Sequence, residues 1–195
     1  SPQITALASQ RLFGDPTYHR KRISVFTDAQ PSYIDTCLPG DVTADDPNVW
    51  VINQGREERS LPTSADSKNI LPPTATSGLP SLREEIVEAI SFFAAEANHE
   101  LDPAELRLGV NSLELLTTEY DQTTLEQFLT TVTTLVDGHN GMAHYHLPRP
   151  DDDTLVNDLM PLFDARIELR HSRHQFPEQR WHVPNKNWTT VWTQL

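Results

Sequence analysis

The feature that most constrains the fold is an alternation of short β-rich runs with longer amphipathic runs. Residues 22–27, 48–53, 106–110 and 142–147 have the length and composition of single strands. Residues 82–98 and 123–136 carry apolar side chains at spacings of three and four, which predicts helices. Single strands separated by helices need crossover connections, so we expect an α/β fold with a mainly parallel sheet flanked by helices.

The remaining segments extend this pattern at both ends. We expect helices over residues 4–13, 113–119 and 154–163, and closing strands over 165–170, 179–183 and 189–195. The closing strands have no helices between them, which predicts antiparallel C-terminal strands. Pro80 and Ser81 are expected to begin the helix over 82–98, with Glu84 and Glu85 in its first turn. The side chains expected to be buried are Ile86, Ile90, Phe93, Phe128 and Val132.

A chain of 195 residues that is 37% hydrophobic can bury one substantial core. We therefore expect a single domain over residues 1–195. Residues 54–80 are rich in Pro, Ser and Thr and lack periodicity, which predicts a long mobile loop.

The net charge of the chain limits the classes of molecule that it could bind. The net charge of -13 comes from 28 acidic against 15 basic residues, and only three of the latter are lysines. This balance is typical of proteins from a salt-loaded cytoplasm, where the Debye length is about 3 Å at 1 M salt. The alternatives are a surface for a basic partner, or solubility in ordinary salt. Nucleic-acid binding and a role as a transcription regulator are disfavoured, because phosphates need clustered Lys and Arg. The one basic triplet, Arg20–Arg22, is expected to be a solvated strand entry.

Compartment is suggested by cysteine usage and hydropathy. The single cysteine, Cys37, excludes an internal disulfide and suits a reducing cytosol. No apolar run reaches the roughly 20 residues of a transmembrane helix. We expect a cytoplasmic protein without a membrane partner.

Several short motifs, taken in order, resemble one family. They are Val110–Leu113 after the middle strand, Phe128–Leu129 in the next helix, His144–Pro148 at a strand end, Leu162–Asp164, and Arg180–His182 on a late strand. In order and spacing they resemble the RecA/KaiC-like domains of haloarchaea, many of them of unassigned function. The resemblance implies a RecA-like fold in which Glu105–Glu119 corresponds to the acidic (Walker B) strand and following helix.

Two departures from that family bear on activity. Asn111 stands where an active member has the aspartate that helps hold magnesium. The chain has 7 glycines and no Gly-rich loop ending in Lys-Ser or Lys-Thr to hold phosphates. The resemblance thus implies a degenerate site at Asn111 and Ser112, no cofactor and no catalytic residue. We expect a pseudo-ATPase that binds a protein partner or itself in regulation or assembly.

Two histidines support an alternative hypothesis, in which the chain has a metal or nucleotide site. On a strand, His144 and His146 would point to the same face and could bind a metal. A nucleotide-binding protein or a metal-assisted hydrolase using this region is therefore the alternative function. The structural alternative is that they cap a strand end and bond to the backbone or to Asp164.

Two further groups have both structural and functional interpretations. Asp151–Asp153 could bind a cation, or could begin a helix with Asp153 or Thr154 as its cap. Trp181, Trp188 and Trp192 could complete a core or form a partner surface. Ser112 has no visible base, and a Gly-x-Ser-x-Gly motif is absent from the sequence, so a serine nucleophile is not expected.

Overall fold

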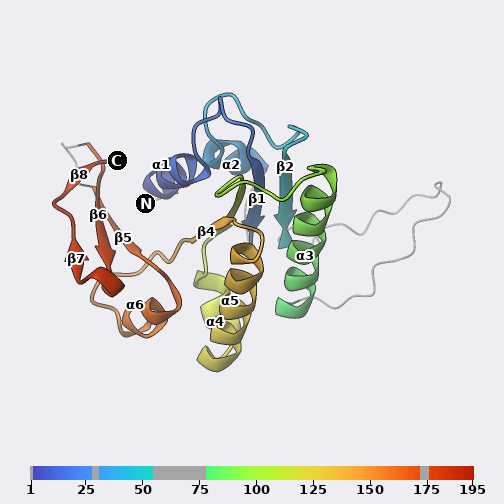
Figure 1. Cartoon of the computed structure of the whole chain (residues 1–195). Helices are drawn as coiled ribbons and strands as arrows, with labels where there is room; N and C mark the ends of the chain where they lie inside the picture. The colour runs from blue at the N-terminus through green and yellow to red at the C-terminus, as the bar shows by residue number, and fades with distance from the viewer. Residues whose placement is uncertain (1, 28–30, 55–77, 172–175) are drawn as a thin grey trace.

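The computed structural model of the chain describes residues 2–27, 31–54, 78–171 and 176–195 (Figure 1). Most of the loop expected over 54–80 lies outside the described residues. Within those ranges no helix is both long and apolar enough to cross a membrane.

Four strands form a parallel sheet at the centre of the molecule, which confirms the α/β class. They are β1 (Lys21–Phe26), β2 (Val49–Asn53), β3 (Leu106–Asn111) and β4 (Met142–Tyr145), in the order β2-β1-β3-β4. In the register of β1 with β3, Lys21 pairs with Leu106 and Phe26 pairs with Asn111. The carboxyl ends of these two central strands therefore lie side by side.

One face of this sheet is covered by α3 (Leu79–Glu96) and α5 (Gln122–Asp137), with the short α4 (Glu114–Glu119) preceding α5. The predicted core is confirmed: Ile86, Ile90, Phe93, Phe128 and Val132 are all buried. The predicted start of α3 is wrong, because the helix begins at Leu79. Gly78 takes a φ of 128° and its carbonyl accepts the Leu82 N–H, so Glu84 and Glu85 lie beyond the first turn.

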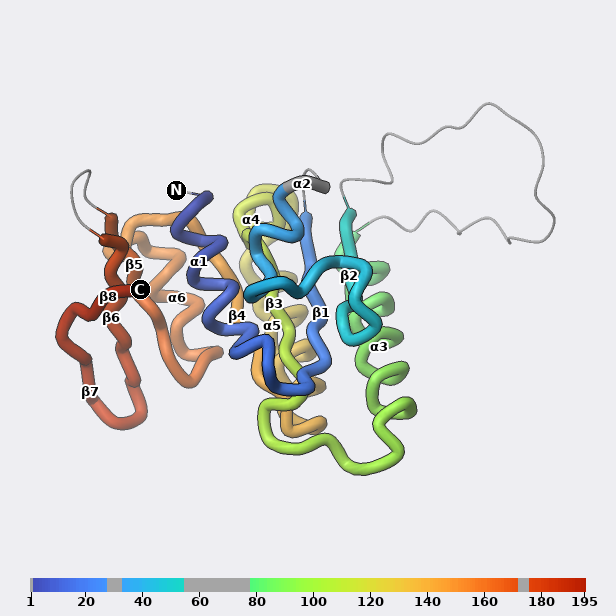
Figure 2. The backbone as a smooth tube through the Cα atoms, turned by 90° about the horizontal axis from the view of Figure 1, so that it is seen from above, coloured from blue at the N-terminus to red at the C-terminus, as the bar shows by residue number. Residues whose placement is uncertain are grey.

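The other face is covered by α1 (Pro2–Phe13), α2 (Pro31–Ile34) and the 3₁₀ turn η1 (Asp35–Cys37). Gly109 of β3 lets α1 approach closely, because a Cβ atom there would lie 2.5 Å from Phe13 Cζ. Phe26, Ile34 and Cys37 pack together under α2 and η1. Figure 2 shows α1 between the parallel strands and the C-terminal strands, on the side away from α3.

The basic triplet at the start of β1 is not a solvated entry. Arg22 is buried; its Nε and Nη2 donate to the carbonyls of Phe13 and Asp15 at 3.3 and 3.2 Å. Arg107 Nη1 likewise donates to the Leu12 carbonyl at 3.0 Å. Both guanidinium groups thus lie at the carboxyl end of α1, where the helix dipole favours positive charge.

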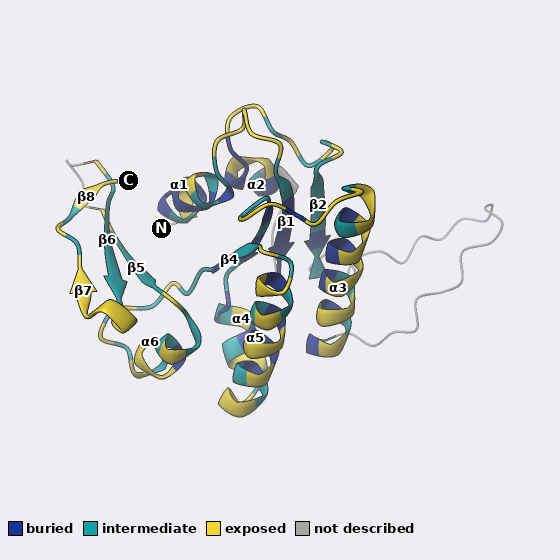
Figure 3. Ribbon diagram, in the orientation of Figure 1, coloured by how far each residue is buried: buried dark blue, intermediate teal, exposed yellow. Residues whose placement is uncertain are grey.

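The last third of the chain forms a second, antiparallel sheet, as expected. After α6 (Thr154–Leu159) and η3 (Met160–Leu162) come β5 (Arg166–Arg170), β6 (Glu178–Val183), η4 (Pro184–Lys186), β7 (Trp188–Thr189) and β8 (Thr193–Gln194). The strand expected over 189–195 is replaced by β7 and β8, which both pair with β6. No residue of these four strands is buried (Figure 3). Leu195 attaches the sheet to Ile4 and Ala8 of α1.

Candidate functional site

The carboxyl ends of β1 and β3 are where a ligand site would be expected. The chain crosses from β1 to β2 on one side and returns to β3 on the other, so the strand order reverses between β1 and β3. In open α/β sheets, ligands bind outside the carboxyl ends of the strands at such a reversal. Thr27, Asn111 and Ser112 lie at this position.

Asn111 is engaged in holding the fold together. Its Nδ2 donates to Sγ of Cys37 at 3.2 Å, which joins the end of β3 to η1. Cys37 is buried, and this burial raises the pKa of its thiol, so the sulfur is a neutral acceptor at physiological pH. The amide therefore has a neutral partner from the segment that covers this face of the sheet.

Ser112 forms the turn between β3 and α4. Its φ is 75°, its Oγ accepts the Glu114 N–H at 3.1 Å, and its carbonyl accepts the Thr27 hydroxyl at 3.2 Å. The hydroxyl thus satisfies an amide at the start of α4, a common role for serine in turns. Both residues of the expected degenerate site are used in local structure.

An ion pair that no sequence motif predicts lies beside this turn. Arg149 Nε and Nη2 donate to the two carboxylate oxygens of Glu114, each at 2.9 Å, and Arg149 Nη1 lies 3.6 Å from Asp153 Oδ2. Asp153 also accepts the Leu155 N–H at 2.9 Å as the cap of α6. The helix-entry interpretation of Asp151–Asp153 is confirmed for Asp153. Glu114 and Arg149 are 35 residues apart, so only the fold could bring them together.

His144 lies on β4 and His146 just beyond it, because the strand expected over 142–147 ends at Tyr145; both side chains contact α1. The His146 Nε2 is 2.7 Å from Ser9 Oγ, and the His144 ring packs edge-on against Phe13 at 4.8 Å. Neither ring nitrogen of His144 has a hydrogen-bond partner among the described residues. Burial lowers the pKa of both side chains, to about 4 for His146, so both are neutral at physiological pH. The partner of His146 is a serine of α1 rather than Asp164.

Possible metal ligands gather elsewhere. Within the described ranges, groups of three such side chains occur at His99, Asp102 and Glu105, and at Asp151, Glu168 and His182. Neither group includes His144 or His146.

The second group is an ion-pair network. Arg180 Nε donates to Glu168 Oε2 at 2.9 Å, His182 Nε2 lies 3.0 Å from the same oxygen, and Arg166 Nη1 lies 3.2 Å from Asp151 Oδ1. Two guanidinium groups thus supply the positive charge that a cation would bring.

Comparison with protein families assigns the chain to one family. Residues 1–169 match the model of DUF7504, a family of unknown function. The chain belongs to this family. A search of curated proteins gave no match. The DUF7504 match contains the whole parallel sheet, both edge residues Asn111 and Ser112, and β5 up to Leu169.

The three tryptophans proposed as a partner surface lie beyond the DUF7504 match and have different environments. Trp188 is 55% exposed, and Trp181 is partly buried on β6. The centroid of the Trp192 ring lies 3.9 Å from Arg170 Cζ and 4.7 Å from Arg180 Cζ, so the ring makes cation–π contacts with two guanidinium groups. Phe176 and Val191 in the same region are 73% and 78% exposed.

A hollow of about 430 Å³ lies between η3 and η4, away from Asn111. Its lining includes Met160, Phe163, Asp164 and Asn185. This mixture of apolar and neutral polar groups with one carboxylate provides no set of catalytic groups.

Proposed function

We propose that the chain is a non-catalytic, RecA/KaiC-like domain that acts by binding another protein or itself, in regulation or assembly in the cytoplasm of a halophilic archaeon. The chemistry at the carboxyl edge of the sheet supports the non-catalytic part. Asn111 bonds to a neutral thiol and Ser112 caps a turn. A phosphate group would need an amide cradle and a lysine, and the sequence has no Gly-rich loop to supply them.

The observation that carries the binding role is the incomplete burial of the C-terminal sheet. Antiparallel sheets usually pack one face on a core, yet none of the residues in β5, β6, β7 and β8 is buried. Phe176, Trp188 and Val191 expose most of their apolar side chains in this region. Large exposed apolar and aromatic side chains are typical of surfaces that bind other proteins.

Site-specific photo-crosslinking tests this proposal. A benzophenone side chain placed at Trp188, in the full chain expressed in its native host, should form a discrete protein adduct that mass spectrometry identifies. The matched control places the same group at Tyr18, which is exposed on the loop before β1. Adducts to a second copy of this chain would indicate self-association. Equal or absent crosslinking at the two positions would count against the C-terminal sheet as a binding surface.

The alternative, a metal-assisted hydrolase or a nucleotide site at His144 and His146, has less support. His144 is buried and His146 is partly buried against α1, and His146 is already bonded to Ser9. A hydrolytic metal needs an open coordination position and access for substrate, which this packing does not provide.

A further inference from the structure

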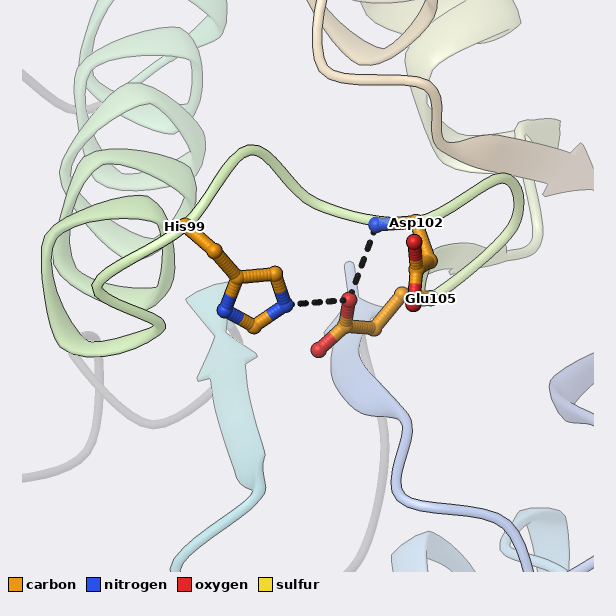
Figure 4. Close-up of side chains that lie close together, drawn as sticks. All are labelled: His99, Asp102 and Glu105. Carbon is orange, nitrogen blue, oxygen red and sulfur yellow. Dashed lines mark hydrogen bonds and ion pairs between the residues drawn. The ribbon is translucent and has the colours of Figure 1, made fainter.

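The connection between α3 and β3 brings three potential metal ligands together on the opposite edge of the sheet from Asn111. His99, Asp102 and Glu105 each offer one ligand atom, and these atoms lie within 4.8 Å of one another (Figure 4). The residues are close in sequence, so the path of this connection sets their geometry. This edge has no part in the binding role proposed above.

The distance between two of the ligand atoms fits a tetrahedral ion. His99 Nε2 lies 3.4 Å from Glu105 Oε2. Zinc bonds of about 2.0–2.2 Å at tetrahedral angles place adjacent ligand atoms roughly 3.3–3.6 Å apart. An ion could therefore join these two atoms with little movement of either side chain.

The second observation concerns the orientation of the imidazole. His99 Nδ1 is 2.5 Å from the carbonyl oxygen of Ala97, which is outside the group of ligands. This bond requires a proton on Nδ1 and leaves the lone pair of the neutral ring on Nε2, the atom that faces Glu105. Metal-binding histidines almost always donate their other ring N–H in this way, commonly to a backbone carbonyl.

The Glu105 carboxylate is held in place by its neighbours within the group, and its ion-pair partner is His99. Glu105 Oε2 accepts the Asp102 N–H at 2.9 Å. Among the described residues, neither carboxylate pairs with Lys or Arg; Arg107 Nε donates instead to the Ala104 carbonyl at 2.8 Å. The bond to the Ala97 carbonyl and the nearby Glu105 carboxylate raise the pKa of His99, so a bound ion would replace the proton on Nε2. Two carboxylates beside this imidazole suit a divalent ion, unlike the group at Asp151, where Arg166 and Arg180 already supply positive charge.

We propose that His99, Asp102 and Glu105 form a binding site for a divalent transition metal of the zinc or cobalt type. The three side chains provide one nitrogen and two oxygen ligands, and water takes the fourth position. His99 is about half exposed, so the ion has an entry path from solvent. A bound ion joins the end of α3 to the segment that begins β3.

Cobalt titration of the full chain tests the site. The protein is prepared without a histidine tag, treated with a chelator, and kept in excess Mg²⁺, which prefers octahedral oxygen sites and so occupies non-specific carboxylates. We expect a saturable visible absorption band of tetrahedral Co²⁺ at one ion per chain, which Zn²⁺ then abolishes by displacement. His99→Gln and Glu105→Gln should each weaken Co²⁺ binding by about tenfold or more.

Two histidine variants serve as matched controls. His19→Gln removes an exposed imidazole outside the site, and His182→Gln removes one from the arginine-containing group. Both should bind Co²⁺ as the wild type does. Thermal melts without metal should show that all four variants are folded. The proposal is overturned if saturable absorption is absent, if the folded His99→Gln and Glu105→Gln variants keep it, or if His19→Gln loses it equally.

Discussion

At the scale of single residues, the two histidines at the end of β4 are the most unusual feature. His144 and His146 lie 5.3 Å apart, ring centroid to ring centroid, under α1, and both are neutral because burial disfavours their charged forms. A neutral ring is compatible with this packing, whereas an imidazolium would be buried without a carboxylate partner among the described residues. The free energy of unfolding should therefore depend on pH through these two side chains.

We predict that His146 makes the fold less stable in acid. Burial lowers its pKa from the ordinary value of 6.5 to about 4 in the folded chain, so below pH 6.5 the unfolded state binds more protons. Folding stability should fall between pH 6.5 and 4, by about 2 kcal/mol at pH 5 from this side chain. Thermal melts of wild type and His146→Gln across this range measure the difference.

The glutamine variant keeps a polar group that can bond to Ser9 but does not titrate. Its stability should depend less steeply on pH than that of the wild type, whereas His19→Gln, at an exposed position, should follow the wild-type curve. Parallel curves for wild type and His146→Gln would show that His146 is not the titrating group.

A second residue-scale prediction concerns the amide at the end of β3. Asn111→Ala removes the donor that Cys37 Sγ accepts, so η1 should open more often. The rate at which a thiol reagent modifies Cys37 in the native protein should therefore rise. As a control, Gln54→Ala removes an amide that bonds to Glu85 at the end of β2 and should leave the rate unchanged. Equal rates in Asn111→Ala and wild type would mean that Asn111 does not hold this segment.

At the scale of elements, the sequence predicts those features of a helix or strand that depend on the local spacing of apolar residues. The apolar spacing of three and four in α3 and α5 correctly identifies the face that packs on the sheet. Apolar spacing does not locate the start of α3. Proline is tolerated in the first turn of a helix, where a backbone N–H would have no intrahelical acceptor, so Pro80 does not mark the boundary. The chain enters the helix through the positive φ of Gly78. The element boundary thus depends on a backbone conformation that composition alone does not reveal.

The contacts of the candidate site join segments that are far apart in the sequence, so the sequence pattern does not predict them. Asn111 and Ser112 could be placed at the end of a strand from sequence, but the bond from Asn111 to Cys37 spans 74 residues. The group at His99 is local in sequence, yet its spacing matches no familiar metal motif, so only the turn geometry reveals it. The burial of Arg22 is likewise invisible in the sequence, because its partners are backbone carbonyls at and after the end of α1.

Packing of α5 gives a direct test at this scale. Phe128 is buried against the sheet, so Phe128→Ala should lower the free energy of unfolding by about 3–5 kcal/mol. Phe92 on α3 offers a matched control, because the same side chain is 48% exposed there and its removal should cost far less. Denaturant unfolding of both variants gives the two values; similar losses would mean that α5 packs differently.

At the scale of the whole molecule, the acidic surface and the uncovered C-terminal sheet stand out. The parallel sheet and its helices fall within the family match, whereas β6 and the strands that pair with it lie beyond it. The C-terminal sheet is attached to the parallel-sheet part through Leu195, Ile4 and Ala8. The binding surface proposed above therefore lies outside the part of the chain that defines the family match.

Salt should stabilise the whole molecule if the net charge of -13 reflects a salt-loaded cytoplasm. Surface carboxylates with few lysine partners repel one another, and molar KCl reduces the screening length to about 3 Å. The melting midpoint should therefore rise from low to molar KCl. A flat or falling midpoint would favour the other interpretation, an acidic face for a basic partner.

The central claim is that the carboxyl edge of the parallel sheet is structural rather than catalytic, and turnover of magnesium-ATP tests it most directly. The full chain, assayed in molar KCl, should release no phosphate above the buffer background. Asn111→Asp should also be inactive, because restoring the carboxylate does not restore a phosphate loop. Phosphate release by the wild type that is lost in Asn111→Ala would contradict the claim.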